Sequence, residues 1–415
     1  AMERAFGHYV TTGQTDNAVA VADFPHSTLV QNLMKETHRR ALKLVKEGSH
    51  QAARILSLYG YSLGAATGSD LTQSRDAFER ALEIVRREGD EALEVRILSS
   101  YANILSFHLQ WEEALPMAAE AIDREDESNN PVDILRALLW VSQGATSTGE
   151  FKQGEETADN MLARARVTRD HYWIARAMNA MMDAVSAQGR FDEALAIVAE
   201  ANSMGLSEPI MNAIAINVLS QVGRFGDAHS LIKSMSETPL FAKAYYLELG
   251  KDEAMAHALE EATTEDAIQA DLLFLTPIFH MRVRYGLSIL ANLRRDPEVA
   301  AEEYQQIINL VGDVNGAYVA RSNQRVLGDL AKTSGDEPAA EIHYQRSVKF
   351  CRETGFKPEL AWSLYEYADL LLTRDGDRDR EKAGPMLDEA LALTTDMGMK
   401  PLMEKVLSKR EILKA

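Results

Sequence analysis

Four short segments of this chain repeat one pattern, an aromatic residue followed three positions later by alanine or glycine. They read WEEA at 111–114, FKQG at 151–154, FDEA at 191–194 and FGDA at 225–228. The small last residue therefore advances by 40, 40 and then 34 positions. A nearly fixed step of this size predicts a stack of helical hairpins. Such a stack presents a long concave surface, which favours a binding function over a catalytic one.

The pattern has a physical explanation within each hairpin. Glycines at 149, 189 and 223 precede three of the aromatics and supply the left-handed backbone that ends the first helix, helix A. The aromatic then packs back between the two helices, and the small residue lets helix A and helix B approach closely. A degenerate form of the same turn at 13–18 (GQTDNA) predicts another hairpin within 3–22.

Helical periodicity extends this organisation along the chain. We predict an all-α fold, a right-handed superhelical α-solenoid of about nine hairpins. Three long segments are each expected to form one continuous helix, namely 28–47, 267–293 and 316–333. The chain is expected to divide into N-terminal helices at 1–48, regular repeats at 49–235, a short irregular repeat at 236–266, further repeats at 267–398 and a capping helix at 399–415. The irregular repeat includes a predicted helix at 251–262. It either kinks the stack or changes its curvature.

Composition limits the function classes. The formal net charge of −19 argues against nucleic acid or an anionic membrane surface as a partner. The single cysteine, Cys351, excludes an intrachain disulfide; it indicates a cytoplasmic location and is expected to pack as a small hydrophobic residue. No long apolar run predicts a membrane span. The chain ends within a predicted helix, so we expect it to be part of a longer protein.

Catalytic motifs give no support for an enzyme. The sequence has no GxxxxGK[ST] phosphate loop and no HExxH zinc motif, and its ten histidines are scattered. We therefore expect no enzymatic activity, no cofactor and no metal site. An enzyme built on a closed helical toroid is a remote alternative. The glycine run at 60, 64 and 68 is interpreted as a close helix contact.

These helix pairs resemble the tetratricopeptide repeat. Phe78 with Ala81, and Ala194 with Ala201, occupy the positions of that family's helix-B signature. The resemblance implies a superhelical stack of helix pairs. The 40-residue step is longer than the family's 34 and is similar to an elongated variant found in bacterial signalling regulators.

A closer resemblance covers the two ends of the chain, around Ser49–Glu88 and over residues 350–410, and its most specific segments are C-terminal. The segments KPELAW at 357–362, YADLL at 367–371, DREKA at 379–383, LDEAL at 387–391 and GMKPLME at 398–404 form one block. It resembles the C-terminal repeats of bacterial regulators that carry a STAND-type ATPase, of the LuxR-type, cyclase-linked and maltose-activator-like kinds. The resemblance implies a sensor and scaffold, although no ATPase or DNA-binding motif occurs in these residues.

The repeat register suggests where a ligand would bind. Aligning the repeats by their turn aromatics places Arg96, Arg136 and Arg176 at one position of three successive A helices. Polar residues three and seven positions later fall on the same helix face. Arginine suits carboxylate or phosphate groups, so this stripe predicts a binding groove. Alternatively, each arginine pairs with an acidic residue of the adjacent repeat, such as Glu94 or Asp133, and holds the stack in register.

A less regular stripe continues in the C-terminal repeats, where Tyr285 is favoured as a packing residue. The candidate binding residues share the predicted concave face, and they are Arg96, Ser99, Asn103, Arg136, Gln143, Arg176, Asn179, Asp183, Arg282, Tyr285, Arg325 and Asp329.

We therefore predict a non-catalytic, ligand-sensing and protein-interaction domain of a bacterial signalling or transcriptional regulator. Its partner would be a protein or peptide, a small-molecule effector, or both, and binding would change the curvature or packing of the stack. The alternative is a constitutive peptide-binding scaffold, whose binding would not depend on an effector. The oligomeric state is left open.

Overall fold

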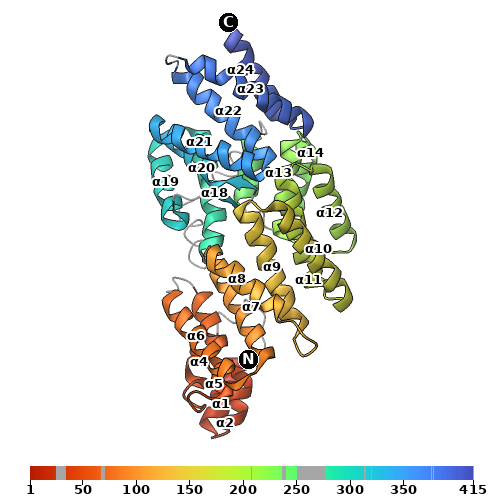
Figure 1. The fold of residues 1–415 in the computed structure, drawn as a ribbon, viewed down its shortest axis with the longest axis vertical. Helices are drawn as coiled ribbons and strands as arrows, with labels where there is room; N and C mark the ends of the chain where they lie inside the picture. Colours follow the sequence, from red (N-terminus) through yellow and green to blue (C-terminus); the bar gives the residue numbers. More distant parts are fainter. Residues whose placement is uncertain are drawn as a thin grey trace. The chain divides into compact units, whose positions relative to one another are not determined.

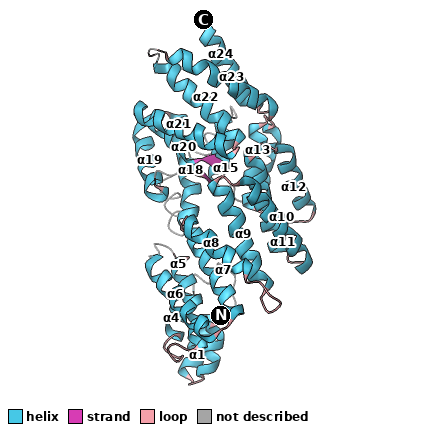
Figure 2. Cartoon of the chain, viewed as in Figure 1, coloured by secondary structure: helices cyan, strands magenta, loops and turns pink. Residues whose placement is uncertain are grey.

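The computed structural model describes the chain except for residues 25–33, 67–70, 207, 236–239, 250–275, 313–314, 319, 375, 377 and 415. The described residues form helices joined by short turns, together with one two-stranded hairpin (Figures 1 and 2). Consecutive helices pack against each other as hairpins. The predicted all-α fold of tetratricopeptide-like hairpins is confirmed.

The chain divides into two compact units, which are described separately. Unit 1 holds residues 1–144 and 272–279, and unit 2 holds residues 145–271 and 280–415. The helices of unit 1 are α1 (Met2–Thr11), α2 (Thr15–Ala22), α4 (Lys35–Ala41), α5 (His50–Gly64), α6 (Leu71–Glu88), α7 (Glu91–Phe107), α8 (Trp111–Asp123) and most of α9 (Pro131–Thr148).

Unit 2 contains the later repeats. Its elements are α10 (Phe151–Thr168), α11 (His171–Ala187), α12 (Phe191–Ser203), α13 (Pro209–Gln221), α14 (Phe225–Ser234), α15 (Leu240–Leu249), most of α18 (Pro277–Arg294), α19 (Pro297–Val311), β1 (Ala317–Tyr318), β2 (Arg321–Ser322), α20 (Asn323–Ser334), α21 (Glu337–Thr354), α22 (Lys357–Arg374), α23 (Asp379–Asp396) and α24 (Lys400–Lys414).

The recurring segments start helix B as predicted. The four aromatics of the pattern are the first residues of α8, α10, α12 and α14. The preceding glycines have positive φ angles, +94° at Gly149 and +80° at both Gly189 and Gly223. The small residues three positions later, from Ala114 to Ala228, are buried. Left-handed turns and close helix contacts therefore explain the pattern.

The N-terminal segment differs from the prediction of one helix over 28–47. Residues 28–33 lie outside the described part of the chain, and α4 already ends at Ala41. Two turn hydrogen bonds follow, from Lys43 N to Arg40 O and from Leu44 N to Ala41 O. They let Leu44 pack against the buried cluster around Phe6. Packing of the partly buried Leu42, Leu44 and Val45 against this cluster outweighs the helical propensity of the segment.

The second difference is at 316–333, where one helix was predicted. Instead β1 pairs antiparallel with β2, and α20 begins only at Asn323. The Ser322 amide donates to the Glu359 carboxylate at 2.9 Å, and the Asn323 amide donates to Gly316 O at 2.9 Å. These partners replace the hydrogen bonds that an earlier helix start would make. The predicted helix at 251–262, the first part of the helix at 267–293 and most of the irregular repeat lie outside the described residues.

Unit 2 folds back on itself. Helix α11 packs against α22, and α13 packs against α24. Three turns between a helix A and its helix B also contact the C-terminal repeats. Each of these turns contains a glycine, and a β-carbon added to that glycine would lie close to a residue of the C-terminal repeats. At Gly149 it would be 2.4 Å from Thr354 Cγ2, at Gly189 2.4 Å from Met397 Sδ, and at Gly223 3.6 Å from Pro401 Cδ. We call this line of three turn contacts the seam.

Candidate functional site

A buried ion pair joins two successive A helices of unit 2. Arg325 of α20 donates from Nε and Nη2 to the two carboxylate oxygens of Glu359 on α22, both at 2.8 Å. Its Nη1 also donates to Asp329 Oδ2 at 2.9 Å. Tyr344 donates to the other oxygen of Asp329 at 2.8 Å. Burial raises the pKa of Asp329 to about 7, although Arg325 opposes that shift.

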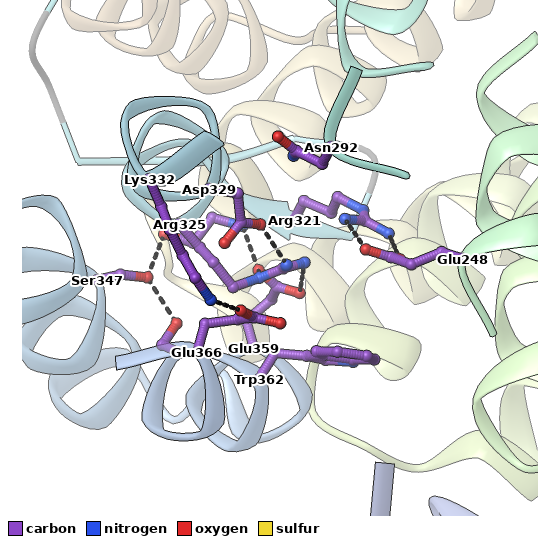
Figure 3. Close-up of polar contacts among 12 residues, drawn as sticks. Glu248, Asn292, Arg321, Arg325, Asp329, Lys332, Ser347, Glu359, Trp362 and Glu366 are labelled. Atoms are coloured by element: carbon purple, nitrogen blue, oxygen red, sulfur yellow. Dashed lines mark hydrogen bonds and ion pairs between the residues drawn. The ribbon is translucent and has the colours of Figure 1, made fainter. Parts of the chain in front are cut away.

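The network continues to α15 through a second arginine. Arg321, at the start of β2, is 3% exposed and pairs with Glu248 of α15 (Figure 3). Its guanidinium also lies over the Tyr245 ring, 4.3 Å from the centroid. Burial alone would raise the pKa of Glu248, but Arg321 outweighs that effect and holds the pKa below its ordinary value. Arg321 thereby links the β-hairpin to α15.

A third group of charges reaches the last helix. Lys332 of α20 donates to Glu366 Oε2 at 3.0 Å and to Asp369 Oδ2 at 2.5 Å on α22. Asp369 also pairs with Lys409 of α24. Figure 3 shows Arg325, Glu359, Lys332 and Glu366 gathered between α20 and α22. These ion pairs connect α20, α22 and α24.

The predicted stripe on α11 lies in unit 2 and is largely buried. Asn179 is 5% exposed, and its Oδ1 has no hydrogen-bond partner. The Arg176 Nε also lacks a partner, although Arg176 Nη1 lies 3.7 Å from Glu208. Burial raises the pKa of Asp183 to about 6, with Arg282 opposing the shift. Asp183 of α11 and Arg282 of α18, predicted in separate stripes, are therefore brought near each other.

Helix α13 continues the polar face. Asn217 and Gln221 are 5% and 6% exposed. Gln221 Oε1 accepts a hydrogen bond from Trp362 Nε1 of α22 at 3.0 Å. We call Arg176, Asn179 and Asp183 with Asn217 and Gln221 the α11–α13 stripe. Within unit 2, α22 thus covers part of this stripe.

The candidate residues of unit 1 lie on α7 and α9 and form bonds between A helices. Ser99 donates to Asp133 O at 2.7 Å, and Asn103 Oδ1 accepts from Tyr61 at 3.3 Å. Arg136 Nη1 donates to Asp133 Oδ1 at 2.9 Å, within its own helix, and to Ser100 Oγ at 3.3 Å. Arg96 and Gln143 are both partly exposed.

The two arginine interpretations remain open. The Arg176–Glu208 pair spans adjacent repeats, as the register interpretation requires, whereas Arg136 pairs within α9. Tyr285 is fully buried and its hydroxyl donates to Asn323, which agrees with a packing role. Cys351 is also fully buried, and burial raises the pKa of its thiol to about 12. Its packing role is confirmed.

Sequence reasoning missed the acidic partners Glu248, Glu359 and Glu366, although a usable signal exists for two of them. Glu359 follows Arg325, and Glu366 follows Lys332, by 34 positions in each case. The same 34-residue offset joins Ser99 of α7 to Asp133 of α9, so it marks residues that meet across consecutive A helices, although the repeat itself is longer, with α21 and α23 starting at Glu337 and Asp379. Glu248 lies in the irregular region, where no repeat register connects it to Arg321.

The glycine run in α5 has a second feature. Residues 60–64 read GYSLG, which has the GxSxG spacing of a nucleophile elbow. Ser62 lies within the helix, is fully buried and donates to Leu58 O at 3.0 Å. His38 Nδ1 lies 2.9 Å from Ser62 Oγ, but Ser62 is buried inside a helix and does not lie on the exposed strand-to-helix turn of a nucleophile elbow. The glycines instead allow close contact, because an added β-carbon at Gly64 would lie 2.3 Å from Ile104 Cγ2.

Two further properties concern the described residues only. Among them, no group of three His, Cys, Asp or Glu side chains could hold a metal ion. None of the helices in the described part of the chain has the length and apolar character needed to cross a bilayer.

No protein-family model matches the chain, and no curated protein matches it. Similar solved structures include a Rap protein complexed with competence and sporulation factor, with a TM-score of 0.45, 11% identity, and coverage of 95% of this chain and 97% of that chain. The APC/C hetero-tetramer Cut9–Hcn1 has a TM-score of 0.31, 13% identity, and coverage of 98% and 96%. At TM-scores below 0.5, neither similarity indicates what this chain binds.

Proposed function

We propose that unit 2 is a non-catalytic binding module whose α11–α13 stripe receives a peptide segment of a partner protein. The observation that carries this proposal is the set of uncompensated polar groups on one face of α11. Asn179 Oδ1 and Arg176 Nε lack partners, and the Asp183 carboxyl has a pKa raised to about 6 by burial. Natural proteins rarely bury polar atoms without partners, so such atoms mark candidate ligand contacts.

A peptide main chain has the chemistry to satisfy this face. It presents N–H donors and C=O acceptors in alternation. Asn179 offers an unpaired acceptor, and Arg176, one helical turn away, offers an unpaired donor. Amide side chains at Asn217 and Gln221 can each donate and accept. The stripe therefore suits an extended peptide better than a purely anionic ligand.

The wider biological role belongs to the same proposal. The C-terminal block at 357–404 resembles repeats of bacterial signalling regulators, and this supports a sensing role in such a protein. The peptide would come from a partner or act as the signal itself. A constitutive scaffold differs in one respect, because its peptide binding would not alter the protein's output.

Peptide selection tests the proposal. A random heptapeptide library displayed on phage is selected on the full chain, and the affinity of enriched peptides is measured by fluorescence polarisation. Asn179→Leu should lower affinity at least tenfold while leaving stability unchanged or raised, because it removes an unpaired buried acceptor. Tyr172→Ala, at an exposed residue of the same helix, is the matched control. Equal affinity of Asn179→Leu and the control would contradict the proposal.

A further inference from the structure

Three of the five residues of the α11–α13 stripe, Asn179, Asn217 and Gln221, are buried, whereas Arg176 and Asp183 are partly exposed. Only 5% of the Asn179 surface and 6% of the Gln221 surface are exposed to solvent. Trp362, which is 1% exposed, covers Gln221 and binds its Oε1 at 3.0 Å. Lys405 Nζ of α24 lies over the Trp362 ring, 5.2 Å from its centroid. A ligand can therefore reach Gln221, the part of the stripe that Trp362 covers, only if α22 moves away from α13.

The seam is the contact that such a movement would break. It consists of the turns at Gly149, Gly189 and Gly223 against Thr354, Met397 and Pro401. These contacts join repeats that are distant in sequence, whereas a linear repeat stack needs only contacts between neighbours. Breaking the seam thus leaves each hairpin packed against its own neighbours.

The seam borders an open surface cleft. A cavity of about 520 Å³ lies along it, between the starts of α12 and α14 and the turn from α23 to α24. Charged side chains from both sides line this cavity, including Arg190 and Arg224 on one side and Asp396 and Lys400 on the other. Because exposed charged residues line this cleft, solvent reaches the outer edge of the seam.

We propose that the seam is a reversible gate, and that its opening controls access to the α11–α13 stripe. The proposal rests on the proposed function, because it concerns how a peptide reaches that stripe. In the closed state the chain's own α22 occupies the face of α13 that the peptide needs. Peptide binding would then shift unit 2 toward an open state by its preference for that state.

A disulfide across the seam tests the gate. A β-carbon on Gly223 would lie 3.7 Å from Lys400 Cβ, within the range of about 3.5–4.5 Å that disulfides adopt. The native Cys351 is buried and should not interfere. In Gly223→Cys/Lys400→Cys, oxidation should lower the affinity for a selected peptide at least tenfold, and reduction should restore it. The single variant Lys400→Cys controls for loss of the lysine. Unchanged affinity after complete oxidation would overturn the gate.

A ligand-free measurement separates the gate from the proposed function. Spin labels at Ala199→Cys on α12 and Ala392→Cys on α23, both exposed positions, report the distance across the seam by electron–electron resonance. We expect a second, longer distance whose population rises when Met397→Ala removes a seam contact. One narrow distance, unchanged by Met397→Ala, would overturn the gate. Two distances in a protein for which selection enriches no peptide would support the gate motion and count against the proposed function.

Discussion

Arg325 and Glu359 form a doubly hydrogen-bonded ion pair from which solvent is excluded. Both N–O distances are 2.8 Å, and the two side chains are 1% and 2% exposed (Figure 3). The residues occupy consecutive A helices, α20 and α22, so one pair joins two hairpins. A buried pair of this kind contributes little over an apolar replacement, but each partner depends strongly on the other.

Removing one partner should therefore be costly. We expect Glu359→Gln to lower the free energy of unfolding by about 3–5 kcal/mol, because it leaves the Arg325 charge buried and incompletely paired. Urea unfolding followed by tryptophan fluorescence measures the change. The exposed Arg166–Glu200 pair, with side chains 51% and 49% exposed, is the control. Glu200→Gln should cost less than about 1 kcal/mol. Equal losses in the two variants would contradict the assignment of Arg325–Glu359 as a buried pair.

The same pair shows what the sequence can and cannot predict. Local backbone and packing requirements determine the turn glycines, the first residue of each helix B and the small residue three positions later. The positions of these residues agree with the prediction. The Arg325–Glu359 pair was missed, although its 34-residue offset also joins Ser99 to Asp133. The seam could not be predicted from the sequence, because Gly189 and Met397 are far apart along the chain and only tertiary folding brings them together. The β-hairpin before α20 depends on the distant Glu359 carboxylate, which no local pattern reveals.

Close approach of helices in unit 1 gives a second prediction. Gly64→Ala places a methyl group 2.3 Å from Ile104 Cγ2 and 2.8 Å from Ser74 Oγ, so it should destabilise by about 1–3 kcal/mol. Gly7 lies within α1 and has no atom within 4 Å of an added β-carbon. Gly7→Ala should therefore stabilise by about 0.5–1 kcal/mol through helix propensity. Thermal unfolding of both variants checks the contrast, and the same sign in both would contradict it.

The seam contact at Gly189 can be separated from backbone strain. Gly189 and Gly205 have similar φ angles of +80° and +70°, but only Gly189 would place a β-carbon against another residue, 2.4 Å from Met397 Sδ. Alanine at either site should cost about 1–2 kcal/mol of left-handed strain. Gly189→Ala should cost measurably more, and adding Met397→Ala should recover part of that excess. Equal melting temperatures for Gly189→Ala and Gly205→Ala would show that the seam contact is not formed in solution.

Asp183 should make stability depend on pH in a direction that distinguishes it from the salt-bridged carboxylates. Its pKa is raised from the ordinary value of 3.8 to about 6 by burial, against the opposing charge of Arg282. Between about pH 4 and pH 6 the folded protein holds a proton that the unfolded chain has released, so stability falls as the pH rises. Above about pH 6 the folded protein has also released this proton, so Asp183 no longer makes stability change with pH. Asp183→Asn carries no titrating group and should not show this loss.

The difference in melting temperature between Asp183→Asn and the unmodified chain measures this effect, since other titrating groups are shared. We expect the two proteins to be alike below pH 4 and the variant to be more stable by about 1–3 kcal/mol above pH 6. If Asp183 serves the peptide site, the same variant should also bind selected peptides more weakly, because a group that costs stability is retained for its ligand contact. A constant difference across this pH range would show that Asp183 does not titrate as its surroundings imply, and would remove one of the three uncompensated groups on α11.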